Sequence, residues 1–575
     1  MMGIGAMQDK AQISGQLDVA DANVPLVRRS TGLGRVGTLA LHPFLFAAAS
    51  VFRLYASNLH ELYFSDVATA LAAALGAALV LFLAFGAALR NLGAKAAIIA
   101  SAAIVAGLFY IEIVETANQY VGIGLSPVAA LPIILAILAI IAVAVAWPRI
   151  DFAPANAVLN GIAFVLFLFP AWQVVSHEWT AGGGSLAAAK AVDESESAVA
   201  DASPVADPAK AKNTPDIYYF IFDRYGSQST MAEYYGFDNA DLIDFLEAKG
   251  FHVASDSRAN YLKTAHSLAS TFHMGYLDFL TEDQRSKIGD WHPIYDMLKD
   301  HRVGRFLKSN GYEFIQIGAW WGPTQYNPFA HENYSFGFGE FDNRYLRKTI
   351  IPTVLDAVAP ASTYARRLQW ENGQCQRVPR QIEKVKEIGE RNETTFVFAH
   401  ILVPHDPYVF SPDGHCLSFE EAMQRTERDG YVEQVRYANS LIKDFVSALL
   451  AREGAKPIII IQADEGPFPT RYRNGNLSWH EATVDELKIK MGILNAYYFP
   501  DGDYRDLDQH VTPVNTFRIL FNKHFGTRLE RLPDRVLAFP DYFKIYDFYD
   551  ITDIVGDGPR QMKAAKDSGA SMGPR

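Results

Sequence analysis

The sequence predicts a molecule of two parts: an N-terminal region of five transmembrane helices and an exoplasmic α/β domain whose largely parallel sheet is flanked by helices. Two observations lead to this fold class. Five stretches before residue 176 approach or exceed the ~20 apolar residues that cross a bilayer. After residue 214, short apolar runs alternate with helical patterns, which is typical of a parallel sheet covered on both faces.

The transmembrane domain is predicted at 37–175, with spans at 37–56, 67–89, 96–114, 127–147 and 155–175. Basic residues precede the first span and occupy the loops after the second and fourth spans, at Arg28, Arg29, Arg35, Arg90, Lys95 and Arg149, whereas the other two loops contain none. By the positive-inside rule, the tail 1–36 is cytoplasmic and the chain after the fifth span is exoplasmic. We therefore expect a multi-pass protein of a bacterial cytoplasmic (inner) membrane, with its larger part on the periplasmic side.

Two charged residues, Arg53 and Glu112, lie near the outer ends of predicted spans. They are compatible with a mutual pair or a head-group contact, but side chains that reach the interface separately are the favoured interpretation.

Beyond the membrane, a flexible linker is predicted at 176–213, because this stretch is rich in Ala, Ser, Asp, Gly and Pro and has no sustained apolar period. The α/β domain follows at 214–555, and a disordered tail at 556–575. Strands are expected at 216–223, 312–318, 394–403, 456–464 and 492–499, and amphipathic helices at 239–250 and 430–454.

Charge and cysteine content bear on the partners of the protein and on the redox state of its thiols. The net charge of −12 arises mainly after residue 175 and argues against a nucleic-acid partner. The two cysteines, Cys375 and Cys416, both lie in the exported part, so one disulfide and two free thiols are both open.

Acidic residues end two of the predicted strands. Asp223 ends the first, and Asp464 and Glu465 end the fourth, in "IIIIQADEGP". Ligands of open α/β sheets collect at the carboxyl ends of strands, and carboxylates gathered there repel one another unless a cation such as Mg²⁺ or Mn²⁺ lies between them. The alternative is that these acids only form turns or cap helices.

Thr264 begins a predicted helix in "KTAHS". A hydroxyl at this place can bind the same metal ion and attack phosphorus, or it can simply cap the helix. The preceding Lys263 can lower the pKa of the hydroxyl or hold a phosphate oxygen, or it can be an ordinary solvated lysine.

Two histidines and an aromatic loop are further candidates. His400 ends a strand and His405 follows Pro404, in "AHILVPHDPYVF"; either can contact a transferred phosphate or protonate a leaving group, or be a structural hydrogen-bonding residue. The loop with Trp320 and Trp321 can line a substrate cleft or be a packed aromatic loop.

At these residues the sequence resembles the alkaline phosphatase superfamily, in particular its membrane-anchored branch of lipoteichoic acid synthases, phosphoethanolamine transferases and sulfatase-like proteins. The resemblance covers about 214–500 and rests on the strand-end acids, "TAHS" and "PHDPY". It implies a metal set of Asp223, Thr264, Asp464 and Glu465, with Thr264 as the nucleophile. It also implies a substrate or second-metal role for His405, and it places a distal histidine at His480.

Two departures from the family pattern bear on the chemistry. Glu465 stands where a His or Asn is usual, which favours Mn²⁺ or Mg²⁺, with Zn²⁺ or Ca²⁺ as the other candidates. "TAHSL" lacks the Pro and Arg of the sulfatase motif, which favours phosphoryl chemistry.

The resulting hypothesis is a membrane-anchored, metal-dependent phosphotransferase or phosphodiesterase that acts on a membrane lipid or envelope glycan through a Thr nucleophile. The alternatives are a sulfatase-type or phosphomonoester hydrolase at the same site, and a non-catalytic envelope protein that retains the fold.

Overall fold

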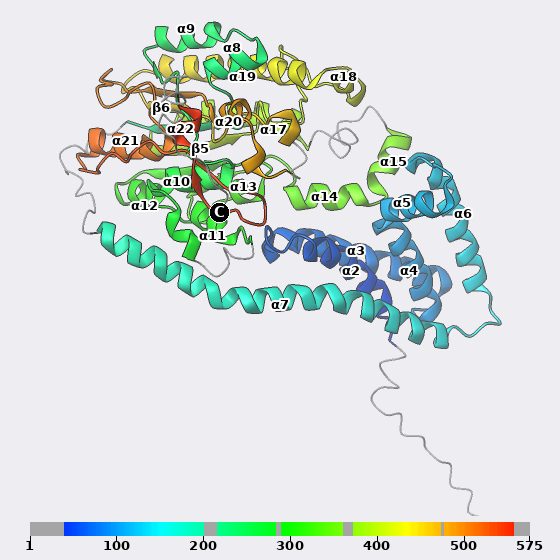
Figure 1. Cartoon of the computed structure of the whole chain (residues 1–575). Helices are drawn as coiled ribbons and strands as arrows, with labels where there is room; N and C mark the ends of the chain where they lie inside the picture. The colour runs from blue at the N-terminus through cyan, green and yellow to red at the C-terminus, as the bar shows by residue number, and fades with distance from the viewer. Residues whose placement is uncertain (1–38, 201–214, 283–288, 360–371, 473–476, 557–575) are drawn as a thin grey trace, which may run out of the picture.

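The computed structural model describes residues 39–200, 215–282, 289–359, 372–472 and 477–556. The predicted tail 1–36 and nearly all of the predicted tail 556–575 lie outside these ranges. Figure 1 shows the two parts of the chain: a group of N-terminal helices and a larger α/β region, joined by one long helix.

The N-terminal region consists of α2 (His42–Ala56), α3 (Phe64–Leu89), α4 (Ala94–Leu108), α5 (Tyr110–Val121), α6 (Pro127–Ala146) and the first part of α7 (Ala153–Ala200). Among the described residues, three helical segments are long and apolar enough to cross a membrane: Phe64–Leu89, Pro127–Ala146 and Ala153–Trp179. The bent pair α4 and α5 makes a fourth if it is counted as one span. The predicted count of five spans is therefore not confirmed, since α2 has only 15 residues.

The predicted third span, 96–114, is not one straight helix. The chain bends by 76° between α4 and α5. Beside the bend, the carbonyl of Gly107 accepts a hydrogen bond of 2.7 Å from the N–H of Ile350, a residue of the α/β region. A break in an apolar helix needs such a partner, because freed backbone groups are costly in an apolar environment.

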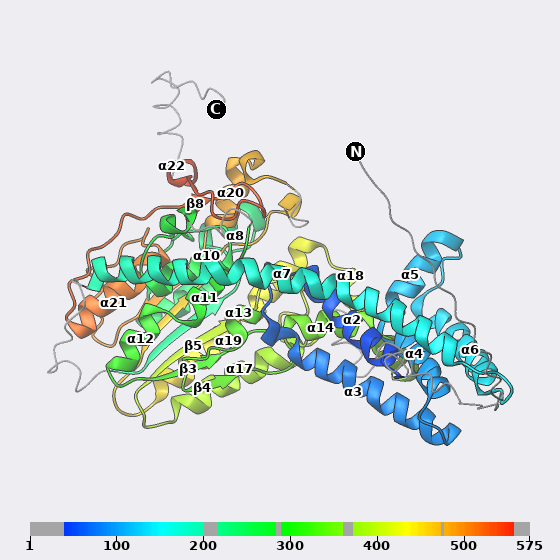
Figure 2. The same ribbon diagram turned by 90° about the horizontal axis from the view of Figure 1, so that it is seen from below.

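Helix α7 also differs from the prediction. It continues to Ala200, so the first part of the expected linker at 176–213 is helical, and 201–213 lies outside the described residues. Its alanine content explains the continuation, because alanine has the highest helix propensity. Figures 1 and 2 show α7 running from the membrane helices alongside the α/β region.

The α/β region is built on a sheet of seven strands in the order β2-β7-β6-β1-β5-β3-β4. The strands are β1 (Ile217–Phe222), β2 (His252–Val253), β3 (Glu313–Ile317), β4 (Glu332–Tyr334), β5 (Thr395–Ile401), β6 (Ile458–Gln462) and β7 (Asn495–Tyr498). Strands β6, β1, β5, β3 and β4 pair in parallel, and β7 is antiparallel to both β6 and β2. The predicted, largely parallel sheet is confirmed.

Helices cover both faces of the sheet because the strands are apolar on both. Strand β1 sends Ile217, Tyr219 and Ile221 into one buried cluster and its alternate residues into the other. The first cluster contains α10 (Thr264–His273), α11 (His292–Lys299), α12 (Arg302–Ser309) and α21 (Thr516–Phe525), and the second contains α9 (Ala240–Ala248), α17 (Gln374–Gly389) and α19 (Glu427–Ala451). Figure 1 shows these two helical layers on opposite sides of the sheet.

Shorter elements complete the region: α8 (Gln228–Tyr235), α13 (Gly322–Gln325), α18 (Phe419–Met423), α20 (Val484–Met491), α22 (Thr552–Val555), and the pair β8 (Leu537–Ala538) and β9 (Tyr549–Asp550). Cys375 and Cys416 form a disulfide, with their Cα atoms 5.7 Å apart. This settles the pairing that the sequence leaves open.

Two helices of the α/β region, α14 (Glu340–Lys348) and α15 (Ile351–Val358), pack on the membrane helices. Tyr345 contacts Ser50 through their hydroxyls at 2.7 Å. Glu112 Oε1 pairs with Arg53 and with Lys348, each at 3.2 Å. Arg53 and Glu112 therefore form the mutual pair, and that pair extends to a cation of the α/β region.

Candidate active site

The strand order brings the predicted acids together. Because β1 lies between β5 and β6, the residues at the carboxyl ends of these three strands are neighbours. Ligand atoms of Asp223, His400 and Asp464 lie within 4.8 Å of one another. None of the three residues is more than 2 % exposed. The site therefore lies at the carboxyl edge of the parallel strands, where ligands of such sheets collect.

Thr264 is the first residue of α10, at the same edge. The N-cap position belongs to Lys263, and no side-chain cap is formed, so the capping interpretation of Thr264 is not supported. The Thr264 hydroxyl contacts the Asp464 carboxylate. Thr264 is half-buried, whereas Ala265 and every later residue of α10 are buried. The hydroxyl is thus held against an acid at the only part of the helix that is open to a ligand.

The acids at this edge titrate differently. Burial and the charges of Asp223 and Glu465 raise the pKa of Asp464 well above its usual value. Burial alone would also raise the pKa of Asp223, but His405, His400 and Arg224 together hold it below its usual value. A second negative charge beside Asp223 is therefore unfavourable unless a cation compensates it.

The donor set fits a divalent cation. Asp223 Oδ1 and Asp464 Oδ2 are buried and have no hydrogen-bond partner among the described residues. Buried carboxylate oxygens normally have partners, and two such oxygens beside a hydroxyl form the set of hard donors that Mg²⁺ and Mn²⁺ prefer. Asp223, Asp464 and Thr264 are the residues that would hold the ion.

Glu465 has other partners. Its Oε1 atom accepts from Arg224 Nε at 3.1 Å and pairs with Lys490 Nζ at 2.9 Å. Its Oε2 atom accepts the Thr264 N–H at 3.1 Å. Burial would raise the pKa of Glu465, but Lys490, Arg224 and Lys263 outweigh burial and lower it. Both oxygens are engaged, so the predicted role of Glu465 as a metal ligand stays a prediction, and its contacts are those of a buried counter-ion.

The cations around Glu465 share an aromatic surface. Arg224, Lys263 and Lys490 each lie over the ring of Phe468, at 4.3, 4.2 and 3.7 Å from its centre. Burial lowers the pKa of Lys263 to about 8 and that of Lys490 to about 7. Lys263 donates to the Tyr542 hydroxyl at 2.6 Å, so it is not the ordinary solvated lysine of the alternative interpretation.

The two histidines of the predicted site differ in access. His400 is fully buried, with Nε2 at 3.2 Å from Asp223 Oδ2 and Nδ1 at 2.7 Å from the Thr324 hydroxyl. These contacts are those of a residue that orients Asp223, and its burial leaves it no surface for a substrate. His405 is half-buried and its Nδ1 donates to the Asp406 carbonyl, which leaves Nε2 as a proton acceptor. Burial lowers the pKa of His405.

A cavity of about 310 Å³ opens in front of these groups. One wall comprises Asp223, Arg224, Lys263, Thr264, His405, Glu465 and Tyr542, and the predicted Trp320 and Trp321 also line it. The opposite wall comes from the end of α2, the segment that joins α2 to α3, the start of α3 and the first part of α14, with Leu54, Asn58, Glu61, Leu62, Asp66, Glu340, Asp342 and Arg344. The cavity therefore lies between the α/β region and the membrane helices.

Some residues differ from their predicted places. His480 does not occur among the described residues that line the cavity; it is exposed and its ring stacks on Tyr549 at 4.3 Å. Sequence reasoning missed Arg224 and Lys490. Arg224 carried a signal, because it directly follows the strand-end acid, whereas Lys490 lies on α20 in an unremarkable helical pattern.

Comparison with protein-family models gave no match, and neither did comparison with curated proteins. Solved structures do match. The C-terminal periplasmic domain of EcEptC from Escherichia coli, in complex with Zn, is 12% identical, covers 60% of this chain and 97% of its own, and has a TM-score of 0.38. The corresponding domain of the phosphoethanolamine transferase EptC from Campylobacter jejuni is 12% identical, with coverage of 55% and 91% and a TM-score of 0.34.

A protein in the alkaline phosphatase superfamily from Vibrio parahaemolyticus is also 12% identical, with coverage of 59% and 79% and a TM-score of 0.34. The superfamily named for the Vibrio parahaemolyticus protein is the one that the motifs of this sequence resemble. Similarity at this level transfers neither an activity nor a substrate to this chain, so the chemistry has to be argued from the cavity.

Proposed function

We propose that this protein is a metal-dependent transferase of a phosphate-containing head group, which takes the group from a membrane lipid through Thr264. One observation carries the proposal: the cavity has the Thr264 hydroxyl and two strand-end acids on one wall and the α2–α3 segment of the membrane region on the other. A lipid head group at the membrane surface can enter such a cavity while its acyl chains stay in the bilayer.

In the first step, Thr264 Oγ forms a bond to phosphorus as the bond between phosphorus and the lipid glycerol oxygen breaks. The threonine proton passes to the adjacent Asp464 carboxylate, and the departing glycerol oxygen takes up a proton from solvent. A divalent cation, with Mn²⁺ or Mg²⁺ favoured, supplies activation of the hydroxyl and neutralisation of phosphate charge when it is bound by Asp223, Asp464 and Thr264. Glu465 fixes the backbone of Thr264, and Arg224 and Lys263 bind the remaining phosphate oxygens.

In the second step, a hydroxyl of an envelope glycan or another lipid attacks the phosphothreonine. As the new bond between oxygen and phosphorus forms, His405 takes the proton of that hydroxyl at Nε2, the bond between phosphorus and Thr264 Oγ breaks, and Oγ takes back the proton held by Asp464. Water in place of the acceptor would make the same site a phosphodiesterase.

The charges on the cavity walls favour a head group of both signs. Arg224 and Lys263 lie on the Thr264 side. Among the described residues, the side formed by α14 and the membrane region has four acids, Glu61, Asp66, Glu340 and Asp342, and one cation, Arg344, which pairs with Glu340 at 2.7 Å, so acids are in excess there. Burial raises the pKa of Glu340 and of Asp342, and an ammonium group would compensate charges that are costly to bury. A phosphate ester that carries an amine, as in phosphatidylethanolamine, would place its negative phosphate on the Thr264 side of the cavity and its positive ammonium on the acidic side.

The same proposal includes the setting: a multi-pass protein of a bacterial inner membrane with its α/β region on the periplasmic side, α2 and the bent α4–α5 pair completing five passes. The apolar helices and the pair of α14 and α15 on the membrane helices support this arrangement.

The test uses the full chain in nanodiscs with Mn²⁺ and either phosphatidylethanolamine or phosphatidylglycerol. Intact and peptide mass spectrometry should find an aminoethyl-phosphate adduct on Thr264 and release of diacylglycerol with the first lipid. Thr264→Ala should give neither product, and Thr281→Ala, at an exposed threonine outside the cavity, should behave as wild type. Absence of an adduct and of diacylglycerol with both lipids would refute the transferase. Release of free phosphoethanolamine, with water as the only acceptor, would favour a phosphodiesterase over a transferase.

A further inference from the structure

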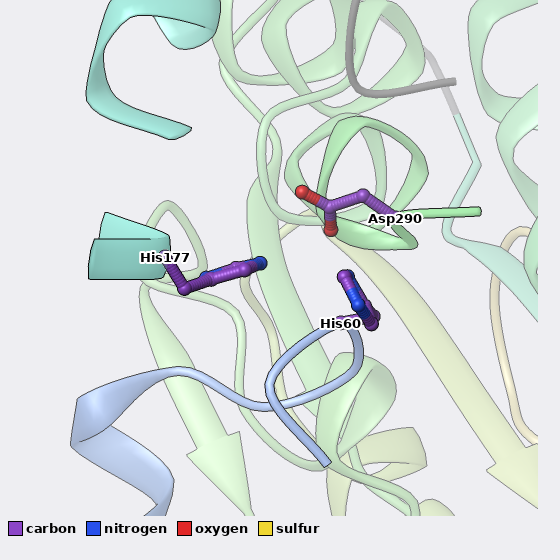
Figure 3. Close-up of side chains that lie close together, drawn as sticks. All are labelled: His60, His177 and Asp290. Atoms are coloured by element: carbon purple, nitrogen blue, oxygen red, sulfur yellow. The ribbon is translucent and has the colours of Figure 1, made fainter. Parts of the chain in front are cut away.

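A second group of metal-ligating side chains lies outside the candidate active site. His60, His177 and Asp290 each offer a ligand atom, and these atoms lie within 4.8 Å of one another. Figure 3 shows the three side chains directed toward a common space from three separate elements. His60 belongs to the segment between α2 and α3, His177 to α7, and Asp290 to the segment before α11.

The three elements are held together independently of any ion. The His60 carbonyl accepts a hydrogen bond of 2.9 Å from the N–H of Trp291, the residue after Asp290. Next to His177, Glu178 accepts from the Tyr55 hydroxyl at 3.2 Å, at the end of α2. One backbone contact and one side-chain contact therefore hold the three elements together, and their ligand atoms already lie close to one another.

The carboxylate is oriented in the way that metal-ligating carboxylates are. Asp290 is fully buried, and its Oδ1 atom accepts from the backbone N–H of His292 at 3.0 Å and from His292 Nδ1 at 2.5 Å. His292 Nε2 in turn donates to the Leu62 carbonyl at 3.1 Å. This chain of hydrogen bonds links Asp290 to the segment that carries His60.

We propose that His60, His177 and Asp290 bind a second divalent cation of the Zn²⁺ type, which fastens the α/β region to the membrane region. Two imidazole nitrogens and one carboxylate oxygen are ligands that zinc prefers, at bond lengths of about 2.0–2.2 Å, and a fourth position remains for water. The mixed nitrogen and oxygen donors separate this site from the oxygen donors of the active site. We assign the cation a structural role. The segment that carries His60 also supplies Asn58, Glu61 and Leu62 to the cavity wall, so a cation bound to His60 would hold that wall in place.

The experiment measures the metal content of the full chain in detergent after loading with Zn²⁺ and gel filtration. His60→Gln and His177→Gln should each contain one equivalent less than wild type. Asp464→Asn, in the active site, should lose a different equivalent, so a double change of His177 and Asp464 should lose both. His510→Gln, at an exposed histidine elsewhere, should keep the wild-type content. Zn²⁺ should also raise the Tm of wild type more than that of the His60 and His177 variants, because binding to the folded state stabilises it.

Wild-type metal content in both histidine variants would overturn the proposal. If a variant fails to fold, anomalous diffraction of crystals of the wild-type chain at the zinc edge decides the matter without any substitution. A peak between His60, His177 and Asp290 is expected, and a map with a peak only at the active site would refute the second cation.

Discussion

The backbone N–H of Thr264 donates to Oε2 of Glu465 at 3.1 Å. The acid therefore holds the first turn of α10, and Lys490 and Arg224 hold the acid. The stability of this edge of the sheet and the position of the proposed nucleophile depend on the same carboxylate.

Replacing Glu465 by Gln should destabilise the fold. The change leaves Lys490 and Arg224 without their anionic partner in a buried place, and breaking a buried pair on one side costs about 3–5 kcal/mol. Thermal or chemical unfolding of the full chain should show this loss, while Glu481→Gln, at an exposed glutamate, should be neutral. Equal stability of Glu465→Gln and wild type would mean that the pair contributes little.

Replacing Thr264 by Ala should abolish transfer with little effect on folding, because the side chain is half-buried at a helix end. Loss of a nucleophile costs roughly 10⁴-fold or more in kcat. Thr264→Ser should retain part of the activity, since it keeps the hydroxyl. Steady-state assays with a fluorescent lipid donor make the comparison, and activity of Thr264→Ala near the wild-type level would exclude Thr264 as the nucleophile.

Substrate binding should weaken as the pH rises through about 8. Burial lowers the pKa of Lys263 to about 8, so its ammonium is present below that pH and is lost above it. KM for an anionic phosphodiester should therefore increase between neutral pH and pH ~9. In Lys263→Arg this increase should disappear, because a guanidinium stays charged. A KM profile that is the same in both proteins would remove Lys263 from phosphate binding.

Replacing His400 by Gln should weaken metal binding without removing a ligand of the proposed set. His400 orients Asp223 through the contact of 3.2 Å, and loss of such a supporting group typically costs 10–100-fold in metal affinity. Competition with a chelator measures the affinity, and excess Mn²⁺ should restore activity. Unchanged affinity would show that Asp223 is held well enough by Arg224 and the backbone alone.

The strands were predictable because their signal is local. The runs that become β1, β3, β5, β6 and β7 are apolar on both faces and bounded by turn residues. Strands β2 and β4 are too short to show a pattern, and they form only because neighbouring strands offer free edges.

The membrane region shows what a hydropathy pattern cannot predict about helix geometry. An apolar window records composition and not direction, so it cannot reveal the bend of 76° at Phe109, which depends on Ile350 far along the chain. Helix α7 continues past the predicted end of the fifth span at residue 175, where the sequence has no sustained apolar period. Alanine favours a helix without producing such a period, so an apolar pattern does not reveal this continuation.

Some residues of the candidate site are also revealed by a local sequence pattern, and others only by the packing of the fold. Asp223 and Asp464 were found because acids directly after strands are visible in the sequence. The roles of His400 and Lys490 depend on which side chains face one another across β1, β5, β6 and α20, and that is a property of packing. The far wall of the cavity depends on how the membrane region docks, so no local pattern could have named Glu61 or Glu340.

The pairing of Cys375 with Cys416 bears on how the protein is made. These are the only two cysteines of the chain, and two thiols within one chain have a single way to join. In the proposed periplasmic setting, the α/β region therefore requires an oxidase but no isomerase, because there is no incorrect pairing within the chain to correct. Biogenesis of this protein should depend on the supply of oxidising equivalents and be indifferent to the loss of any disulfide-reshuffling activity.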